Sequence, residues 1–292
     1  MATATETSPL VKARIAGFLY LFGNPFAPFF LFILPSRLIV RGDAAGTARN
    51  IMASESLFRL GIVDLLYNSI LSIFLVMALY QVLKVVNKNM AWLMVIFALA
   101  GVPIGMLNEL SNLAVLQLLS GPDYLSVFTA KQLQALAYFF IRLHSQGLNI
   151  NMIFWGLWLF PMGFLVFKSG FLPKIIGVML VIACIGYVAQ SFAVFLGYNL
   201  SIVFITGWGE LMLGLWLLIK GVNVDQWQKL ALGRAMMRTT PLLLLLDEPT
   251  SAMDPESARL VRDEIARLKS ARRTIIICSH NLNEVEILAD KI

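Results

Sequence analysis

Six polar side chains interrupt long apolar stretches of the sequence and could carry chemistry there. They are Asp64, Asn68, Asn108, Glu109, Asn112 and Glu210. A carboxylate at the centre of a bilayer costs about 2.5–3.5 kcal/mol to insert, so such groups face a bundle interior or a wet cavity. Three interpretations stay open: a polar or proton-linked transport path, interhelical hydrogen bonding worth about 0.6 kcal/mol per contact, or a position near the membrane interface.

A second candidate site follows the apolar run 242–246, where Asp247, Glu248 and Pro249 come next. A continuous apolar run of this length predicts a strand buried in a parallel sheet. An aspartate at the end of such a strand can hold Mg²⁺ through its water shell. The following carboxylate can then polarise an attacking water. The arrangement alone is a weak signal and depends on what surrounds it.

The composition identifies the elements that must position these residues. The chain has 59% apolar and 14% charged residues, whereas soluble domains have about 45–50% and about 25%. This excludes an average soluble enzyme, a disordered chain and a disulfide scaffold. The net charge of +6 is too small to indicate nucleic acid. Cys184 and Cys278 form no C-x-x-C motif, and His144 has no second histidine at ligand spacing, so we expect no metal site there.

Six stretches are long enough to span a bilayer, which needs about 20 apolar residues for a core of about 30 Å. They are residues 13–34, 57–83, 91–119, 151–167, 173–196 and 201–219, and the fourth can extend back through 133–143. No period-two alternation appears, so helices are expected rather than a barrel. The predicted fold is an all-α polytopic membrane bundle of about six transmembrane helices. Pro25, Pro28, Pro103 and Pro161 should kink or end helices.

Lysines predict the orientation of this bundle. The short connections and the end of the last helix carry Lys84, Lys88, Lys168, Lys174 and Lys220. Because positively charged loops stay in the cytoplasm, these segments are expected on the cytoplasmic side. Three arginines in the opposite long loop count against this assignment. We expect a multi-pass protein of the bacterial inner membrane with both termini cytoplasmic.

The charge distribution changes near residue 228. Residues 228–292 hold ten basic and nine acidic residues, close to half of the chain's charge. Here the pattern alternates between helix (228–238), strand (242–246), helix from Asp254, strand (274–278) and helix (281–290), which is a βαβ unit with an added helix. We therefore predict two domains, a transmembrane domain over 1–227 and a cytoplasmic segment over 228–292.

The first part resembles a bacterial integral-membrane family known as domain of unknown function 4386. The resemblance is carried by the segments AGFLYL (16–21), LWLFPMG (157–163) and GLWLLIKG (214–221). It spans residues 8–227. This family implies an architecture but brings no activity, substrate or catalytic residue.

The second part resembles the C-terminal portion of an ABC transporter ATPase. The motif LLLLDEPTSAMD (243–254), and IIICSH (275–280) after it, carry the resemblance, with QKLALGRA (228–235) matching the helix after the family's signature motif. By this resemblance, Asp247 would position Mg²⁺ and Glu248 would act on the lytic water. Ser251 and Asp254 would belong to the nucleotide-facing D-loop, and His280 would be the switch histidine at the γ-phosphate.

The phosphate-binding half of such an ATPase does not appear in the sequence. No G-x-x-x-x-G-K-[ST] motif occurs, although that loop holds the phosphates. We therefore expect a partial α/β P-loop-NTPase-like fragment, truncated at both ends and inactive by itself, arising by gene fusion or by a sequence-assembly error. ATP and Mg²⁺ are expected as cofactors only if a partner chain completes the segment.

Three function classes follow. The first is a membrane protein of unassigned, transport-related activity with a vestigial ATPase segment. The second is an ABC-type ATPase component completed by a partner chain, and the third is a membrane-embedded subunit without chemistry of its own. The lipid bilayer is the expected partner, a membrane-protein partner or a homo-oligomer stays open, and no nucleic acid is expected.

Overall fold

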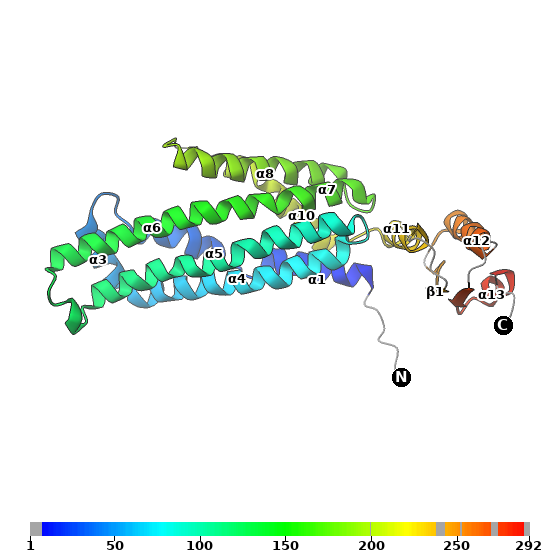
Figure 1. The fold of residues 1–292 in the computed structure, drawn as a ribbon, viewed down its shortest axis with the longest axis horizontal. Helices are drawn as coiled ribbons and strands as arrows, with labels where there is room; N and C mark the ends of the chain where they lie inside the picture. Colours follow the sequence, from blue (N-terminus) through cyan, green and yellow to red (C-terminus); the bar gives the residue numbers. More distant parts are fainter. Residues whose placement is uncertain (1–7, 199, 238–242, 252, 270–273, 289–292) are drawn as a thin grey trace. The chain divides into compact units, whose positions relative to one another are not determined.

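The computed structural model describes residues 8–198, 200–237, 243–251, 253–269 and 274–288 (Figure 1). The chain forms two compact units. Unit 1 comprises residues 1–168 and 173–221, and unit 2 comprises 169–172 and 222–292. The described part is mostly helical, with one small parallel sheet near the C-terminus. The predicted helical class and the parallel strand pair are thereby confirmed, whereas the domain boundary at 227/228 stays a prediction.

Four helical segments of the described chain are long and apolar enough to cross a membrane. They are α4 (Glu55–Leu83), α5 (Lys88–Ser120), α6 (Ala130–Leu157) continuing into α7 (Leu159–Ser169), and α8 (Lys174–Phe195). At 33 residues α5 is about 50 Å long, so one end must extend beyond a hydrocarbon core of about 30 Å. The prediction that residues 133–143 extend the fourth span is confirmed, because α6 contains them.

The first predicted span is not one helix, contrary to the expectation for residues 13–34. α1 (Pro9–Phe22) ends before Gly23, and a π-helix, η1 (Phe29–Ile33), leads into α2 (Leu34–Leu38). Prolines 25 and 28 lie in the gap and cannot donate backbone hydrogen bonds, which explains the break. The π-turn, in which the Leu34 N–H donates to the Phe29 carbonyl, widens the helix just before Pro35. Such widening accommodates a proline ring and is frequent at functional sites.

The last predicted span is interrupted as well, and the remaining prolines behave differently from one another. Residues 201–219 form α9 (Val203–Thr206) and α10 (Trp208–Ile219), separated at Gly207. Pro161 lies just after the break between α6 and α7 at Trp158, as a proline that clashes with the preceding turn should. Pro103 does not end α5, which continues through it.

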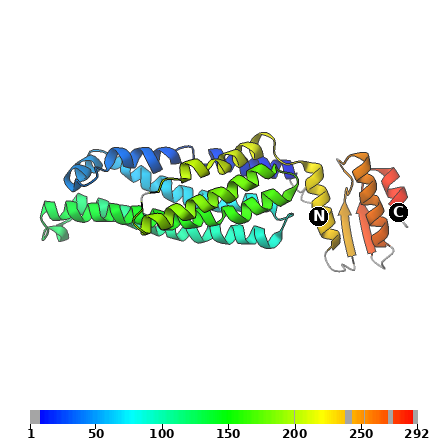
Figure 2. The same cartoon turned by 90° about the horizontal axis from the view of Figure 1, so that it is seen from above.

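The helices of unit 1 pack in a closed order. α4, α5 and α6 lie side by side along the unit (Figures 1 and 2), α6 packs on α8, α8 on α10, α10 on α1, and α1 on α4. α3 (Ala44–Ala53) covers α6 at one end, near the 3₁₀ turn η2 (Asp123–Leu125). A buried cluster at this end joins Leu34, Leu38 and Ile51 to Val115 and Ile141. This packing stabilises the broken first segment against α5 and α6.

Helices α1 and α10 pack closely and antiparallel through glycines. A Cβ on Gly17 would lie 2.5 Å from the Leu218 backbone nitrogen and 2.9 Å from the Gly214 carbonyl oxygen. A Cβ on Gly214 would in turn meet the Leu21 side chain, and one on Gly221 would meet Leu10. Because Leu10 starts α1 and Gly221 follows α10, unit 1 begins and ends on the same side. Small residues that allow such backbone approach are typical of membrane helix contacts.

The substitution Gly17→Ala is expected to lower the stability of unit 1 by about 1–3 kcal/mol, because backbone atoms of α10 would have to move. The measurement is the SDS-denaturation midpoint of the purified chain in detergent. Gly233→Ala on α11 is the matched control, since nothing lies within 4 Å of its Cβ position; it should be neutral or slightly stabilising. Equal midpoints for the two variants would contradict the close contact.

Unit 2 contains α11 (Val224–Met237), β1 (Leu243–Asp247), α12 (Pro255–Lys269), β2 (Thr274–Cys278) and α13 (Leu282–Leu288). β1 and β2 are parallel and in register from Leu243 with Thr274 to Asp247 with Cys278. Leu246, Val261, Ile265 and Leu288 form its buried core. Successive side chains of a strand point to opposite faces, so Ile275 and Ile277 pack on this core while Ile276 is exposed.

The first helix of unit 2 begins earlier than the predicted start at residue 228. Asn223 caps α11, its side-chain oxygen accepting from the Gln226 N–H at 3.1 Å, so that residues 227 and 228 lie within one helix. An asparagine cap satisfies backbone donors of the first turn and thereby sets the helix start. The predicted ends at Arg238, Leu242 and Asp290, and Ala252 of the D-loop, lie outside the described residues.

Candidate functional site

The central feature of the site is a buried acid–imidazole pair between α5 and α6. His144 Nε2 lies 2.8 Å from Glu109 Oε1, and the two side chains are 12% and 3% exposed. The Asn112 side-chain nitrogen donates to Glu109 Oε2 at 2.8 Å. Both carboxylate oxygens of Glu109 are therefore engaged, as a buried acid requires.

Asn108, one turn before Asn112 on α5, forms a second hydrogen bond between α5 and α6. Its side-chain nitrogen donates to the His144 carbonyl at 3.0 Å. A Cβ on Gly147 would clash with the Asn108 carboxamide, so a larger residue there would displace this side chain from the His144 carbonyl. Residues at i and i+4 lie on one helix face, and on this face Asn108 donates to α6 directly while Asn112 donates to Glu109, the partner of His144.

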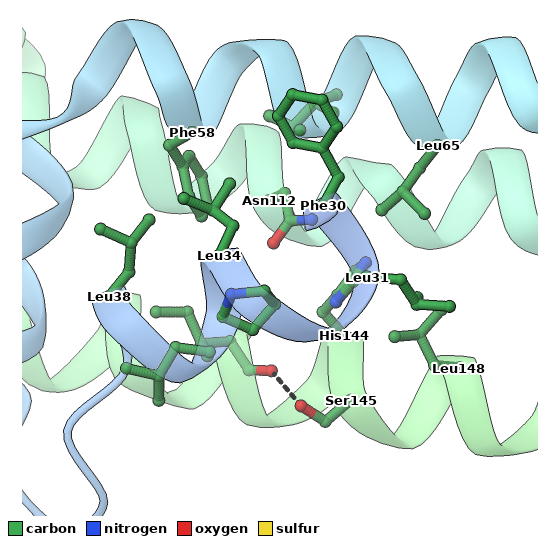
Figure 3. A pocket seen from close by; sticks show the side chains of 15 residues that line it. Phe30, Leu31, Leu34, Leu38, Phe58, Leu65, Asn112, His144, Ser145 and Leu148 are labelled. Atoms are coloured by element: carbon green, nitrogen blue, oxygen red, sulfur yellow. Dashed lines mark hydrogen bonds between the residues drawn. The ribbon is translucent and has the colours of Figure 1, made fainter. Parts of the chain in front are cut away.

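A cavity of about 200 Å³ adjoins this pair (Figure 3). The π-helix and α2 form one wall with Phe30, Leu31 and Leu34, and α4 contributes Phe58 and Leu65. Figure 3 shows Asn112, His144 and Ser145 as the polar residues of a largely apolar lining. Ligand sites commonly combine an apolar lining with a few polar groups that orient the ligand.

A second polar network surrounds Glu210 in the first turn of α10. The Tyr20 hydroxyl on α1 donates to Glu210 Oε2 at 2.8 Å. Tyr187 on α8 also hydrogen-bonds this carboxylate. The Tyr20 ring stacks on Trp158, with centroids 6.1 Å apart. One carboxylate thus ties three helices together, and the first turn of a helix also favours a negative charge.

Asp64 and Asn68 do not join either network. Asp64 is 8% exposed, and its Oδ2 lacks a hydrogen-bond partner among the described residues. Asn24, in the break after α1, is the side chain that interacts with it. Asn68 lies one turn further along α4 and is half-buried. A buried carboxyl oxygen without a partner is costly, so Asp64 is an unusual feature of the bundle.

The depth of these groups follows from the helix rise. The paired lysines lie where α4 meets α5 and where α7 meets α8, and these helix ends are at the same end of unit 1 (Figures 1 and 2). Counting from these lysines at 1.5 Å per residue, Asp64, Glu109 and His144 lie about 30–36 Å away. That is near the far boundary of a core of about 30 Å. Glu210, ten residues before Lys220, lies about 15 Å from this end, at mid-depth.

In unit 2, Asp247 and Glu248 lie at the carboxyl end of β1, as their sequence positions predict. The Glu248 side chain accepts from the His280 N–H, and the Glu248 N–H donates to the Cys278 carbonyl at 2.7 Å. Glu248 has a positive φ of 46°, a conformation uncommon for residues other than glycine. The Asp247 carboxylate, which hydrogen-bonds the Cys278 thiol, raises the pKa of that thiol.

Asp254 is the N-cap of α12, as predicted for the helix start. It accepts from the Ser257 N–H at 3.0 Å and from the Ser257 hydroxyl, and Lys229 Nζ lies 3.4 Å from its Oδ2. These contacts, the Ser257 hydroxyl first, lower the pKa of Asp254. The Asp225 carboxylate, 2.9 Å from Lys229 Nζ, chiefly raises the pKa of that lysine. Ser251 is exposed, and its N–H donates to the Glu248 carbonyl.

The substitution Asp254→Ala should speed hydrogen exchange of the backbone amides in the first turn of α12, because the Ser257 N–H loses its acceptor. Since the pKa of Asp254 is lowered on folding, this stabilisation is fully present above the ordinary pKa and is lost progressively as the pH falls from there through the lowered pKa. Exchange mass spectrometry of the full chain at neutral pH measures the effect. Asp263→Ala, exposed on the same helix, should leave that turn unchanged.

In the described part of unit 2, the residues that the ATPase resemblance assigns to magnesium and nucleotide already have hydrogen-bond partners within the protein. The Glu248 oxygen, which would face the lytic water, accepts from His280, and the Asp254 oxygens cap a helix. No group of three or more His, Cys, Asp or Glu side chains in the described part of the chain could hold a metal ion. The amide cradle that binds phosphates is not encoded in the sequence. The roles assigned to Asp247, Glu248, Ser251, Asp254 and His280 therefore stay predictions.

Fold and site together define a multi-pass helical membrane protein with buried polar networks. The chain belongs to the family described as Domain of unknown function (DUF4386), whose profile matches residues 15–221. An uncharacterized protein of Archaeoglobus fulgidus is 32% identical over 159 residues, which is 54% of this chain and 81% of that relative. No solved structure matches the chain.

A stretch of about 70 residues at the C-terminus resembles part of ABC transporter ATP-binding proteins. ABC transporter I family member 17 of Arabidopsis thaliana is 43% identical over 70 residues, 24% of this chain and 26% of that relative. The ATP-dependent lipid A-core flippase of Xylella fastidiosa is 46% identical over 70 residues, 23% of this chain and 12% of that relative. The chain thus spans about a quarter or less of these ABC relatives.

Sequence reasoning found the carboxylates and carboxamides but missed their partners. His144 is 35 residues from Glu109, and Tyr20 is 190 residues from Glu210. Tyrosines are common in apolar helices near membrane interfaces, so Tyr20 and Tyr187 gave no signal. The single usable hint was His144 itself, a titratable residue on a helix long enough to span.

Proposed function

We propose that unit 1 is a transport-related membrane protein that binds a small, largely apolar molecule in the cavity beside Glu109 and His144. The observation that carries this proposal is the 2.8 Å His144–Glu109 contact next to a cavity in the bundle. The Asn112 and His144 side chains would hydrogen-bond one polar group of the ligand, and the leucines and phenylalanines would hold its apolar part. The π-helix in the cavity wall supports this assignment.

In the proposed topology unit 1 crosses the membrane six times. The four long helices would be joined by two broken crossings, α1 with η1 and α2, and α9 with α10. The antiparallel contact of α1 with α10 supports an even number of crossings. The lysines of the short connections would then place both ends of the unit in the cytoplasm.

The binding proposal is tested with 1-aminoanthracene, an apolar fluorophore with one hydrogen-bonding amine. Its fluorescence is titrated against the full chain in detergent. We expect saturable binding that Gly61→Leu weakens at least tenfold, because Gly61 lines the cavity and a side chain there would fill it. Val63→Leu, 59% exposed on the same helix, is the control and should bind as the wild type does. Unchanged binding by both variants would refute the assignment.

The similarity of unit 2 to ABC ATPases supports a second candidate function, an ATPase component completed by a partner chain. We propose instead that the isolated polypeptide does not hydrolyse ATP, because its sequence lacks the phosphate-binding loop. Magnesium-dependent phosphate release should therefore be the same for the wild type and Glu248→Gln. Turnover by the purified chain that Glu248→Gln abolishes would contradict this. Turnover only in complexes isolated from native membranes would favour the second candidate.

A further inference from the structure

A second cavity in unit 1, of about 500 Å³, lies between α6, α8, the start of α10 and the π-helix. It shares Leu31, Ser145 and Leu148 with the cavity beside His144. Its other lining residues differ in kind, since they include two tryptophans, a tyrosine and two carboxamides. These are Trp155, Trp208, Tyr187, Asn149 and Gln190.

The wall of this second cavity is held in place by hydrogen bonds. The side-chain oxygen of Gln190 accepts from the Ile202 and Val203 N–H groups at 2.9 and 3.1 Å, which fixes the start of α9. Gln190 Nε2 lies 3.8 Å from the Met152 sulfur. Tyr187 is fixed by its hydrogen bond to Glu210. The Tyr187 ring and the start of α9 are therefore held in place before any ligand arrives, which lowers the entropic cost of binding.

The charge around this cavity has one sign. Glu210 does not line the cavity but hydrogen-bonds Tyr187, which does. None of the described residues that line the cavity is a lysine or an arginine. A carboxylate in a low-dielectric bundle attracts a cation far more strongly than it would in water. An anionic ligand would meet no counter-charge and would be repelled.

The aromatic side chains of the lining also favour a positively charged ligand. The faces of tryptophan and tyrosine rings attract cations, by up to about 2 kcal/mol where the site is desolvated, and cages of such rings recognise quaternary ammonium groups. Two indoles and a phenol line this cavity. The apolar lining from Leu148, Met152 and Leu211 suits organic substituents rather than a hydrated metal ion.

We propose that this cavity binds a lipophilic organic cation, of the quaternary ammonium or phosphonium class, held by Trp155, Tyr187 and Trp208 with Glu210 as the counter-charge. This cavity adjoins the pocket beside His144, with which it shares three lining residues, but the inference does not depend on the ligand of that pocket. Such a cation needs no hydrogen-bond donor, because the aromatic rings of the wall and the Glu210 carboxylate behind Tyr187 would stabilise it. Binding near mid-depth of the membrane would place the cation within the bundle rather than at its surface.

The test compares tetraphenylphosphonium with tetraphenylborate, two ions of the same shape and opposite charge. Binding of each to the full chain is measured by equilibrium dialysis in an uncharged detergent, with empty micelles subtracted. We expect saturable binding of the phosphonium and at least tenfold weaker binding of the borate. Equal binding of the two ions would overturn the proposal, because apolar partitioning alone would then explain it.

Two variants locate the ion in the cavity. Glu210→Gln keeps the size of the side chain and removes its charge, and Trp155→Leu keeps an apolar side chain and removes the ring face. Each should weaken phosphonium binding at least tenfold, whereas Trp155→Phe should recover part of the loss. Trp92→Leu, which removes a half-exposed indole away from the cavity, should bind as the wild type does. Wild-type binding by Glu210→Gln and Trp155→Leu together would overturn the assignment.

Folding and the first pocket are controlled separately. Each variant is compared by gel filtration and by its denaturation midpoint, and Trp155→Phe carries the conclusion if Trp155→Leu does not fold. A chain that binds tetraphenylphosphonium but not 1-aminoanthracene would support this cavity and refute the pocket beside His144. The reverse result would refute the cation site alone.

Discussion

Replacing His144 with leucine should lower the free energy of unfolding of unit 1 by about 3–5 kcal/mol, the usual cost of leaving one member of a buried pair behind. Glu109 is 2% exposed and would keep only the Asn112 hydrogen bond. Its second carboxyl oxygen would then be buried without a partner. The measurement is the SDS-unfolding free energy of the purified chain in mixed micelles at neutral pH.

The double variant Glu109→Leu with His144→Leu tests whether the loss of stability comes from the interaction between the two side chains. Replacing both partners of a buried pair by apolar side chains is often nearly neutral. The double variant should therefore be more stable than either single variant. Arg142→Leu, exposed on the same helix, controls for the change in α6 and should stay within about 0.5 kcal/mol of the wild type. Losses that simply add in the double variant would mean that Glu109 and His144 do not interact.

Glu210→Ala should be the second most damaging substitution, at about 2–4 kcal/mol. It leaves the hydroxyls of Tyr20 and Tyr187 without their shared acceptor, and each unpaired buried group costs about 1–3 kcal/mol. Tyr20→Phe removes one donor and keeps the other, so about 1 kcal/mol is expected. Glu210→Gln keeps an acceptor oxygen and should fall between the wild type and Glu210→Ala. The same SDS-unfolding measurement ranks the series.

Met212→Ala serves as the matched control for the Glu210 series, because Met212 is 48% exposed two residues further along α10. It should cost less than Glu210→Ala despite removing a side chain of similar size. If Tyr20→Phe proved as damaging as Glu210→Ala, the stability would come from packing of the Tyr20 ring on Trp158 rather than from the carboxylate. The three-helix role of Glu210 would then be refuted.

The sequence was most informative where a single segment decides its own structure. Apolar length predicts the long helices, because a lipid-facing backbone must satisfy its hydrogen bonds within the segment. Alternating strand and helix patterns predict the parallel pair of unit 2, and Asp254 predicts its helix cap. The early end of α1 was harder to predict from the sequence. A hydropathy average over about 20 residues does not detect the break at Gly23, because the break comes from prolines 25 and 28, which remove backbone donors locally.

Apolar length, the cap and the strand pattern were thus determined by the sequence itself, since each depends on neighbours within a few residues. Only the tertiary structure decided which polar groups meet. Asp64 and Glu109 are both buried carboxylates in apolar helices, yet Glu109 pairs with a histidine while Asp64 has an oxygen without a partner among the described residues. That difference depends on which helix faces which and in what rotation, and long-range packing sets both.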